Sequence, residues 1–235
     1  MKIKLLSSWF GPWPTWIDKY REQMARFECV DWELYPAVES SDPRLQLREY
    51  NALMTERLGT LVNKTIQSIC DVRPFWGDAF AEKYEGYDFW GWCDMDMRFG
   101  DLDKFLPVLL DGNTEVLSFK DRYLSGCFAV FKNTKHTTQL YRLDPTWRDV
   151  LATPNYRCWD ESGYRSDECM WKLILKHDLV VNRVPGLYTY SSATDKQRSH
   201  LVDGKTLIDP DTGKELLFHH FMDDVWPSTY DEDLK

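Results

Sequence analysis

The feature that most constrains the fold is the stretch at residues 87–102, which reads YDFWGWCDMDMRFGDL. Its first half is rich in aromatic and apolar residues, which predicts a buried β-strand. Side chains alternate between the two faces of a strand, so Asp94 and Asp96, at the strand's end, point the same way. Two carboxylates held close together repel each other and need a partner that offsets their charge.

Strands and helices alternate along the rest of the chain. Strands are predicted at residues 2–8, 30–36, 115–119, 123–131, 179–184 and 187–192, and helices at 15–27, 45–59, 102–110 and 161–178. Two extended runs around Asp-Pro-Asp-Thr-Gly-Lys in segment 205–221 predict a hairpin. Alternating units of this kind favour an α/β fold with a mostly parallel sheet covered by helices. Such sheets bind ligands beyond the carboxyl ends of their strands.

Composition limits the class of protein. A chain of 235 residues without a linker-like stretch favours a single domain over 1–222, followed by an acidic tail at 223–235. The net charge of −9, with no basic stripe, argues against binding to nucleic acid. We expect no integral membrane segment, because no apolar run is long enough. The six cysteines form no CxxC pair, which favours reduced thiols and a cytoplasmic location.

A hard divalent cation is the partner that best suits the two carboxylates. Mg²⁺ and Mn²⁺ prefer carboxylate oxygen and leave other coordination positions to water and substrate phosphate. A ligand that contains a diphosphate is therefore expected at the end of this strand. The alternative is a solvated turn after a strand, because Asp-x-Asp triplets also occur by chance.

Three stretches together carry a resemblance to a known family: CDVRPFWG (70–77), YDFWGWCDMDMRFGDL (87–102) and LFHHF (217–221). They resemble the metal-dependent nucleotide-sugar glycosyltransferases of the GT-A type, in particular a bacterial and viral group that acts on polysaccharides and glycans. SSWFGPWPTWIDKY (7–20) and DWELYP (31–36) are similar to that group's first strand, helix and second strand. The resemblance implies a GT-A like fold, with a mostly parallel mixed sheet flanked by helices.

The resemblance also implies a metal site. Asp94 and Asp96 match the family's Asp-x-Asp motif, whose second carboxylate binds the metal and whose first reaches the metal or the donor ribose. His220 matches a C-terminal histidine that supplies a further metal ligand, with the neighbouring His219 as the alternative. The cofactor implied is Mn²⁺ or Mg²⁺.

Other matched residues are implied to contact the substrates. Those on the nucleotide side of the donor are Ser8, Trp9, Phe10, Asp71 and Arg73. An acidic pair, Asp160 and Glu161, matches the acceptor side, where an inverting enzyme has its catalytic base. Capping of the helix predicted at 161–178 explains this pair almost as well.

The activity implied is transfer of a hexosyl or deoxyhexosyl group from a nucleotide-diphosphate sugar, with UDP as the expected nucleotide, to a hydroxyl of a glycan acceptor. Polysaccharide biosynthesis is the expected context. Two alternatives stay open. A metal-dependent phosphohydrolase also uses paired aspartates and a histidine around metal-bound water. A non-catalytic glycan-binding module would use surface aromatics and would tolerate the loss of Asp94 and Asp96.

Overall fold

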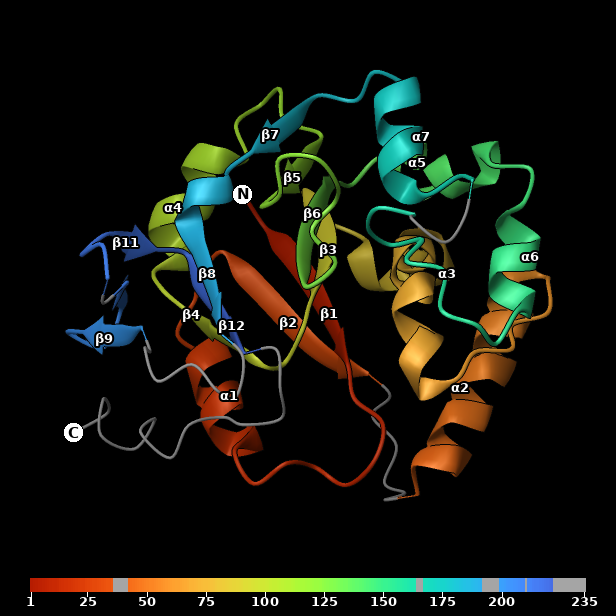
Figure 1. The fold of residues 1–235 in the computed structure, drawn as a ribbon, viewed down its shortest axis with the longest axis horizontal. Helices are drawn as coiled ribbons and strands as arrows, with labels where there is room; N and C mark the ends of the chain where they lie inside the picture. Colours follow the sequence, from red (N-terminus) through yellow and green to blue (C-terminus); the bar gives the residue numbers. More distant parts are fainter. Residues whose placement is uncertain (36–41, 164–166, 192–198, 210, 222–235) are drawn as a thin grey trace.

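The computed structural model describes residues 1–35, 42–163, 167–191, 199–209 and 211–221, so the tail predicted at 223–235 lies outside the described residues. The chain forms one α/β unit around a six-stranded sheet of order β2-β1-β3-β6-β5-β7 (Figure 1). Its strands are β1 (Ile3–Ser8), β2 (Val30–Tyr35), β3 (Phe89–Cys93), β5 (Val116–Ser118), β6 (Phe128–Lys132) and β7 (Val181–Arg183). Only β6 is antiparallel to its neighbours in this sheet. The predicted fold class, a mostly parallel mixed sheet flanked by helices, is therefore confirmed.

Helices cover both faces of the sheet. The α-helices are α1 (Ile17–Met24), α2 (Pro43–Leu58), α3 (Trp76–Ala79), α4 (Leu102–Leu109), α5 (Lys135–Thr138), α6 (Trp147–Ala152) and α7 (Met170–Lys176). The 3₁₀-helices are η1 (Ile66–Phe75), η2 (Ala81–Tyr84), η3 (Leu140–Leu143) and η4 (Pro185–Leu187). Within the described ranges, no helix combines the length and the apolar character needed to cross a bilayer.

Capping residues mark both ends of α2, whereas the start of α7 differs from the prediction. α2 begins after Asp42, whose carboxylate accepts a hydrogen bond from the backbone N–H of Arg44, and ends at Gly59 in the left-handed conformation. The helix predicted at 161–178 is wrong over its first half, because α7 begins only at Met170. Positive φ angles at Cys158 and Gly163 turn the preceding chain instead.

Alternation along β3 divides the core into two layers. Trp90 and Trp92 are fully buried on one face, in the cluster that includes side chains of α2, α3 and α6. Phe89 and Cys93 point to the other face, in the cluster that includes side chains of α1 and α4. Figure 1 shows α1 and α4 on the opposite side of β3 from α2 and α6. These tryptophans are therefore core residues.

Two small sheets follow the central one and bring the C-terminal segment to the end of β3. One contains β4 (Met97–Phe99), β12 (Phe218–Phe221) and β8 (Tyr188–Ser191), and the other β9 (His200–Val202), β10 (Thr206–Ile208) and β11 (Glu215–Leu216). The antiparallel pairing of β10 with β11 confirms the predicted hairpin. β12 lies between β4 and β8, and the backbone N–H of Phe221 donates to the carbonyl of Asp96 at 2.8 Å.

A buried ion pair ties η1 to the chain before α7. Both side chains of the pair, Asp71 and Lys64, are fully buried, and Lys64 Nζ donates to Asp71 Oδ2 at 3.0 Å. The same carboxylate accepts hydrogen bonds from the backbone N–H groups of Arg157 at 2.9 Å and Trp159 at 2.8 Å. Asp71 therefore fixes the segment 157–159 against η1.

We expect Asp71→Asn to lower the free energy of unfolding by about 3 kcal/mol or more, because the Lys64 ammonium is left buried without its counter-charge. Urea denaturation measures this loss. Asp18→Asn is the matched control, since its ion pair with Arg21 is largely exposed and should contribute less than about 1 kcal/mol. Equal stability of the two variants would show that the buried pair does not hold the fold.

Candidate functional site

Asp94 and Asp96 lie at the carboxyl end of β3 and share one side of the chain. Met95 and Met97, on either side of Asp96, are buried in the core, whereas the two aspartates are partly exposed. The backbone N–H of Asp94 donates to the carbonyl of Cys127 at 2.8 Å, which extends the pairing of β3 with β6 by one residue. β3 ends at Cys93, but the alternation of buried and partly exposed side chains continues through the bend to Met97, which keeps both carboxylates outside the core.

The imidazole of His220, on β12, forms a cluster with the carboxylates of Asp94 and Asp96. Its Nε2 lies 3.7 Å from Asp94 Oδ2 and 3.4 Å from Asp96 Oδ1. One ligand atom from each of the three residues lies within 4.8 Å of the others, which makes them a possible metal site. Two carboxylates and an imidazole are a donor set that suits Mn²⁺, and the carboxylates also suit Mg²⁺.

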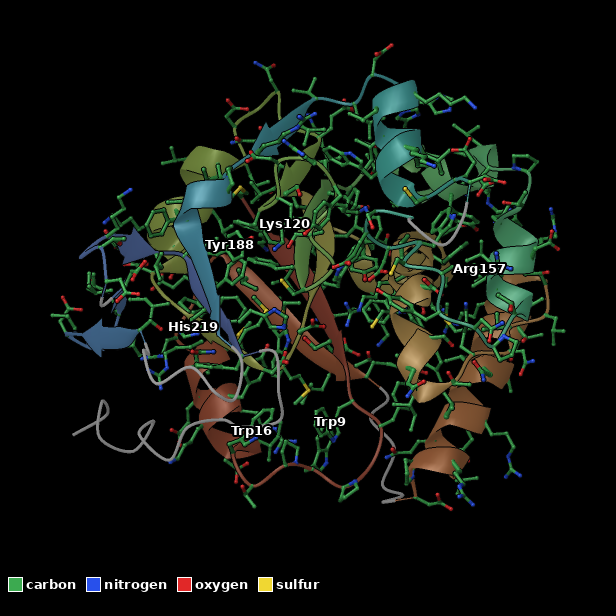
Figure 2. The ribbon with its side chains drawn as sticks, in the orientation of Figure 1. Trp9, Trp16, Lys120, Arg157, Tyr188 and His219 are labelled. Atoms are coloured by element: carbon green, nitrogen blue, oxygen red, sulfur yellow. The ribbon has the colours of Figure 1, made fainter. Side chains whose placement is uncertain are left out.

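His219 points away from this cluster. Its side chain is buried, its Nδ1 lies 2.6 Å from Ser199 Oγ, and its ring stacks on Phe221 with centroids 4.3 Å apart. Neighbouring residues of a strand face opposite ways, and β12 follows this rule. Figure 2 labels His219 beside β12. Of the two histidines, only His220 joins the aspartates.

The ionisation of the cluster reflects burial and close charge. Burial, together with the charge of the nearby Asp96 carboxylate, raises the pKa of Asp94 to about 6, although Arg73 opposes this shift. Burial would lower the pKa of His220, but hydrogen bonds to Asp96 and Cys127 outweigh it and raise that pKa to about 11. Without a metal, this shift favours the protonated imidazole, whose charge offsets that of the two carboxylates. A metal held by His220 would take the place of that proton.

Arg73 connects Asp94 to a second acidic group. From η1 its guanidinium donates a hydrogen bond to Asp94 Oδ1 and another, of 2.6 Å, to the carbonyl of Gly126. The same guanidinium lies 3.6 Å from Asp160 Oδ2. Arg73 is only 9% exposed, so water screens little of its interaction with these two carboxylates. The fork geometry of arginine suits this bridging position.

A cavity of about 450 Å³ opens beside Arg73 and His220. Its acidic wall is formed by Asp94, Asp160 and Glu161, and its other lining residues include Lys120, Tyr123, Tyr156 and Tyr188. Lys120 Nζ lies 4.7 Å from the ring centroid of Tyr188, and Figure 2 shows these two residues near each other above β12. This volume is within the usual range for small-molecule sites.

Lys120 was not among the residues singled out from the sequence. The signal that could have found it is its position two residues after β5, at the same edge of the sheet as Asp94. Tyr156 and Tyr188 carry no comparable local signal, because the chain segments that supply them reach the cavity only through tertiary packing.

Asp160 and Glu161 are not helix caps, since α7 begins at Met170. Asp160 is 1% exposed, and its Oδ1 has no hydrogen-bond donor among the described residues. Burial raises its pKa to about 8, although Arg73 opposes this shift. Glu161 is less buried and accepts a hydrogen bond of 3.2 Å from the backbone N–H of Gly126. Both carboxyl groups line the cavity.

Four residues assigned to the nucleotide side lie outside the cavity lining: Ser8, Trp9, Phe10 and Asp71. Ser8 is the last residue of β1; Trp9 and Phe10 follow it and pack edge-on against Trp16 and Tyr50 (the first pair is labelled in Figure 2). The expectation for Asp71 is corrected, because this side chain is fully buried and both its oxygens accept protein hydrogen bonds. Asp71 therefore has a structural role, since it holds the backbone at Arg157 and Trp159 in place.

Comparison with solved structures supports the fold assignment. A crystal structure of a glycosyltransferase involved in the glycosylation of the major capsid of PBCV-1 matches with a TM-score of 0.51 and 14% identity, over 100% of this chain and 98% of that one. The structure of A197 from STIV matches with a TM-score of 0.39 and 11% identity, over 97% of both chains. At 14% identity the likeness to the first structure concerns the fold alone, and the second is too distant to support the assignment.

Comparison with sequences identifies the family. No curated protein matches the chain. A family of unknown function, DUF6625, matches residues 5–205, which is most of the chain. The protein therefore belongs to the DUF6625 family.

Proposed function

We propose that this protein is a metal-dependent glycosyltransferase that moves a sugar from a nucleotide-diphosphate sugar to a hydroxyl of a glycan acceptor. The observation that carries the proposal is the cluster of Asp94, Asp96 and His220 at the carboxyl end of β3. It borders a ligand-sized cavity, in a fold similar to that of a solved glycosyltransferase. Open α/β sheets bind ligands at this edge.

The donor side is built from the metal cluster and the residues around it. Asp94, Asp96 and His220 would hold Mn²⁺ or Mg²⁺, which when bound offsets the charge that develops on the departing diphosphate. Arg73 holds Asp94 in place through its ion pair. Lys120, also in the cavity lining, supplies a positive charge for the diphosphate.

We expect Asp94 also to contact the donor ribose, as the resemblance implies. The nucleotide base, which we expect to be uracil, lies beyond the cavity at the end of β1, where Ser8, Trp9 and Phe10 offer a hydroxyl and two aromatic rings. Arg73 then contributes to the nucleotide side by fixing Asp94 rather than by direct contact with the base.

The acceptor side is built from the acidic pair. Burial raises the pKa of Asp160 to about 8, so at neutral pH only a minority of this carboxyl group is ionised. The ionised form is strongly basic for a carboxylate, and it is the form that would accept a proton from an acceptor hydroxyl as general base. Its unpartnered Oδ1 is the atom that would receive this proton. Glu161, bonded to the backbone of Gly126, orients the acceptor beside it.

Nucleotide binding should require the metal. With Mn²⁺ present, UDP at a hundredfold excess over its dissociation constant should stabilise the protein by about 2.7 kcal/mol. For a chain of this size the melting temperature rises by about 5–11 °C. A thermal-shift assay with and without Mn²⁺ measures the rise. The proposal fails if no common nucleotide diphosphate stabilises the wild-type protein when metal is present.

Asp96→Asn separates transfer from the two alternatives. This change keeps the shape of the side chain but removes a metal-ligand charge, so release of nucleotide diphosphate from a sugar donor should fall to background. The metal-free melting temperature should change little, because relief of the repulsion with Asp94 is offset by loss of the ion pair with His220. A glycan-binding module would keep its affinity in this variant. Release of nucleoside monophosphate and sugar 1-phosphate from the donor by the wild type would indicate a phosphohydrolase.

The two histidines should differ in their effect on metal binding. His220→Ala should weaken Mn²⁺-dependent UDP binding by about tenfold or more, equivalent to about 1.4 kcal/mol, because one ligand is lost. His219→Ala should leave that affinity unchanged and lower the melting temperature, since it removes a buried ring and its bond to Ser199. Isothermal titration and thermal denaturation give the two readouts. Equal losses of metal-dependent affinity would contradict the assignment of His220 alone to the site.

A further inference from the structure

A second opening adjoins the cavity at Tyr156. This groove has a volume of about 520 Å³ and is lined by Thr65, Gln67, Pro154, Asn155, Tyr156 and Arg157. It lies between the start of η1 and the chain that follows α6. Tyr156 also lines the cavity beside the cluster of Asp94, Asp96 and His220, so the two openings share this residue. Figure 2 shows Arg157 towards α6, whereas Lys120 and Tyr188 lie towards β8.

The side chains of the groove are suited to a ligand rich in hydroxyl groups. Gln67 and Asn155 are exposed, and their side-chain amides form no hydrogen bond with any described residue. Each amide can donate and accept at once, which matches the pattern of neighbouring sugar hydroxyls. The partly buried ring of Tyr156 adds a flat apolar surface of the kind on which a sugar ring packs.

The charge of the groove argues against a phosphate-rich ligand. Arg157 is the one cationic residue in its lining, and no carboxylate of the described chain forms an ion pair with its guanidinium. The whole chain carries a net charge of −9. A polyphosphate or nucleic acid needs several clustered cations, whereas one arginine fork can bind two adjacent hydroxyls or a single sugar carboxylate.

The walls of the groove are held in place by bonds between them. Thr65 Oγ1 donates to the carbonyl of Pro154 at 3.3 Å, and the backbone N–H of Asn63 donates to the carbonyl of Leu151 at 2.9 Å. The backbone N–H of Arg157 is fixed by Asp71. A groove built this way is formed before the ligand arrives, so binding orders few protein groups.

We propose that this groove binds a glycan chain and holds the sugar residues of the acceptor that lie beyond the one reacting in the cavity. This inference rests on the proposed glycosyltransferase function. It names the acceptor as an oligosaccharide or polysaccharide rather than a free monosaccharide. Gln67, Asn155 and Arg157 are then residues that determine acceptor specificity, and Tyr156 lies where the chain enters the cavity.

A glycan microarray that carries defined chains, from monosaccharides to hexasaccharides, tests the proposal with labelled protein in UDP and Mn²⁺. The wild type should bind a subset of chains of three or more residues at least about tenfold more strongly than the matching monosaccharides. The double variant Gln67→Ala/Asn155→Ala should lose this preference and keep the UDP-dependent rise in melting temperature. Asn113→Ala, an exposed amide outside both openings, is the control and should bind as the wild type does.

Three results would overturn the inference: no preference of the wild type for longer chains, an unchanged preference in the double variant, or loss of the UDP response in that variant. The last result would assign the groove to the nucleotide. Failure of the proposed function is separate, because it would appear as a wild type that UDP and Mn²⁺ do not stabilise. If that protein still held long glycans through Gln67 and Asn155, the groove would belong to a non-catalytic glycan-binding protein.

Discussion

The balance of charge around Asp94 is the constraint on which the rest of the site depends. Asp94 and Asp96 are close, partly buried and of like charge, an arrangement that is unfavourable by itself. Positive charge reaches them from Arg73 on η1 and from His220 on β12, two elements far apart in the sequence. Both elements must therefore pack against the end of β3. The insertion of β12 between β4 and β8 is the arrangement that brings the imidazole there.

The sequence predicts the parts of this structure that depend on local periodicity. The strand before Asp94, the ends of α2 and the hairpin of β10 and β11 all follow from alternation, capping and turn residues. The resemblance also led to Asp94, Asp96 and His220, which the fold brings together. Prediction fails where tertiary contacts decide the outcome.

Two cases show that failure. The helix predicted at 161–178 loses its first half because the acidic pair before it turns inward, with Asp160 next to Arg73. In the sequence, Asp71 cannot be told apart from an aspartate that faces a ligand. Its structural role becomes visible only in the fold, where it forms a buried ion pair with Lys64. A 3₁₀-helix has about three residues per turn, so Asp71 and Arg73, two positions apart on η1, point in different directions. One short helix thus supports the groove through Asp71 and the cavity through Arg73.

The pairing of β12 with β4 has a consequence for how the protein is made. His220 lies more than a hundred residues after Asp96 in the sequence, so the loop between them must close before the cluster exists. On a ribosome, the strand that ends in the two aspartates emerges long before its imidazole partner. The nascent chain can form the pairs among β1, β2 and β3 during this interval, while the two carboxylates remain in water. Assembly of the cluster of Asp94, Asp96 and His220 is then one of the last steps of folding, so any function that needs this cluster requires that the chain has folded through β12.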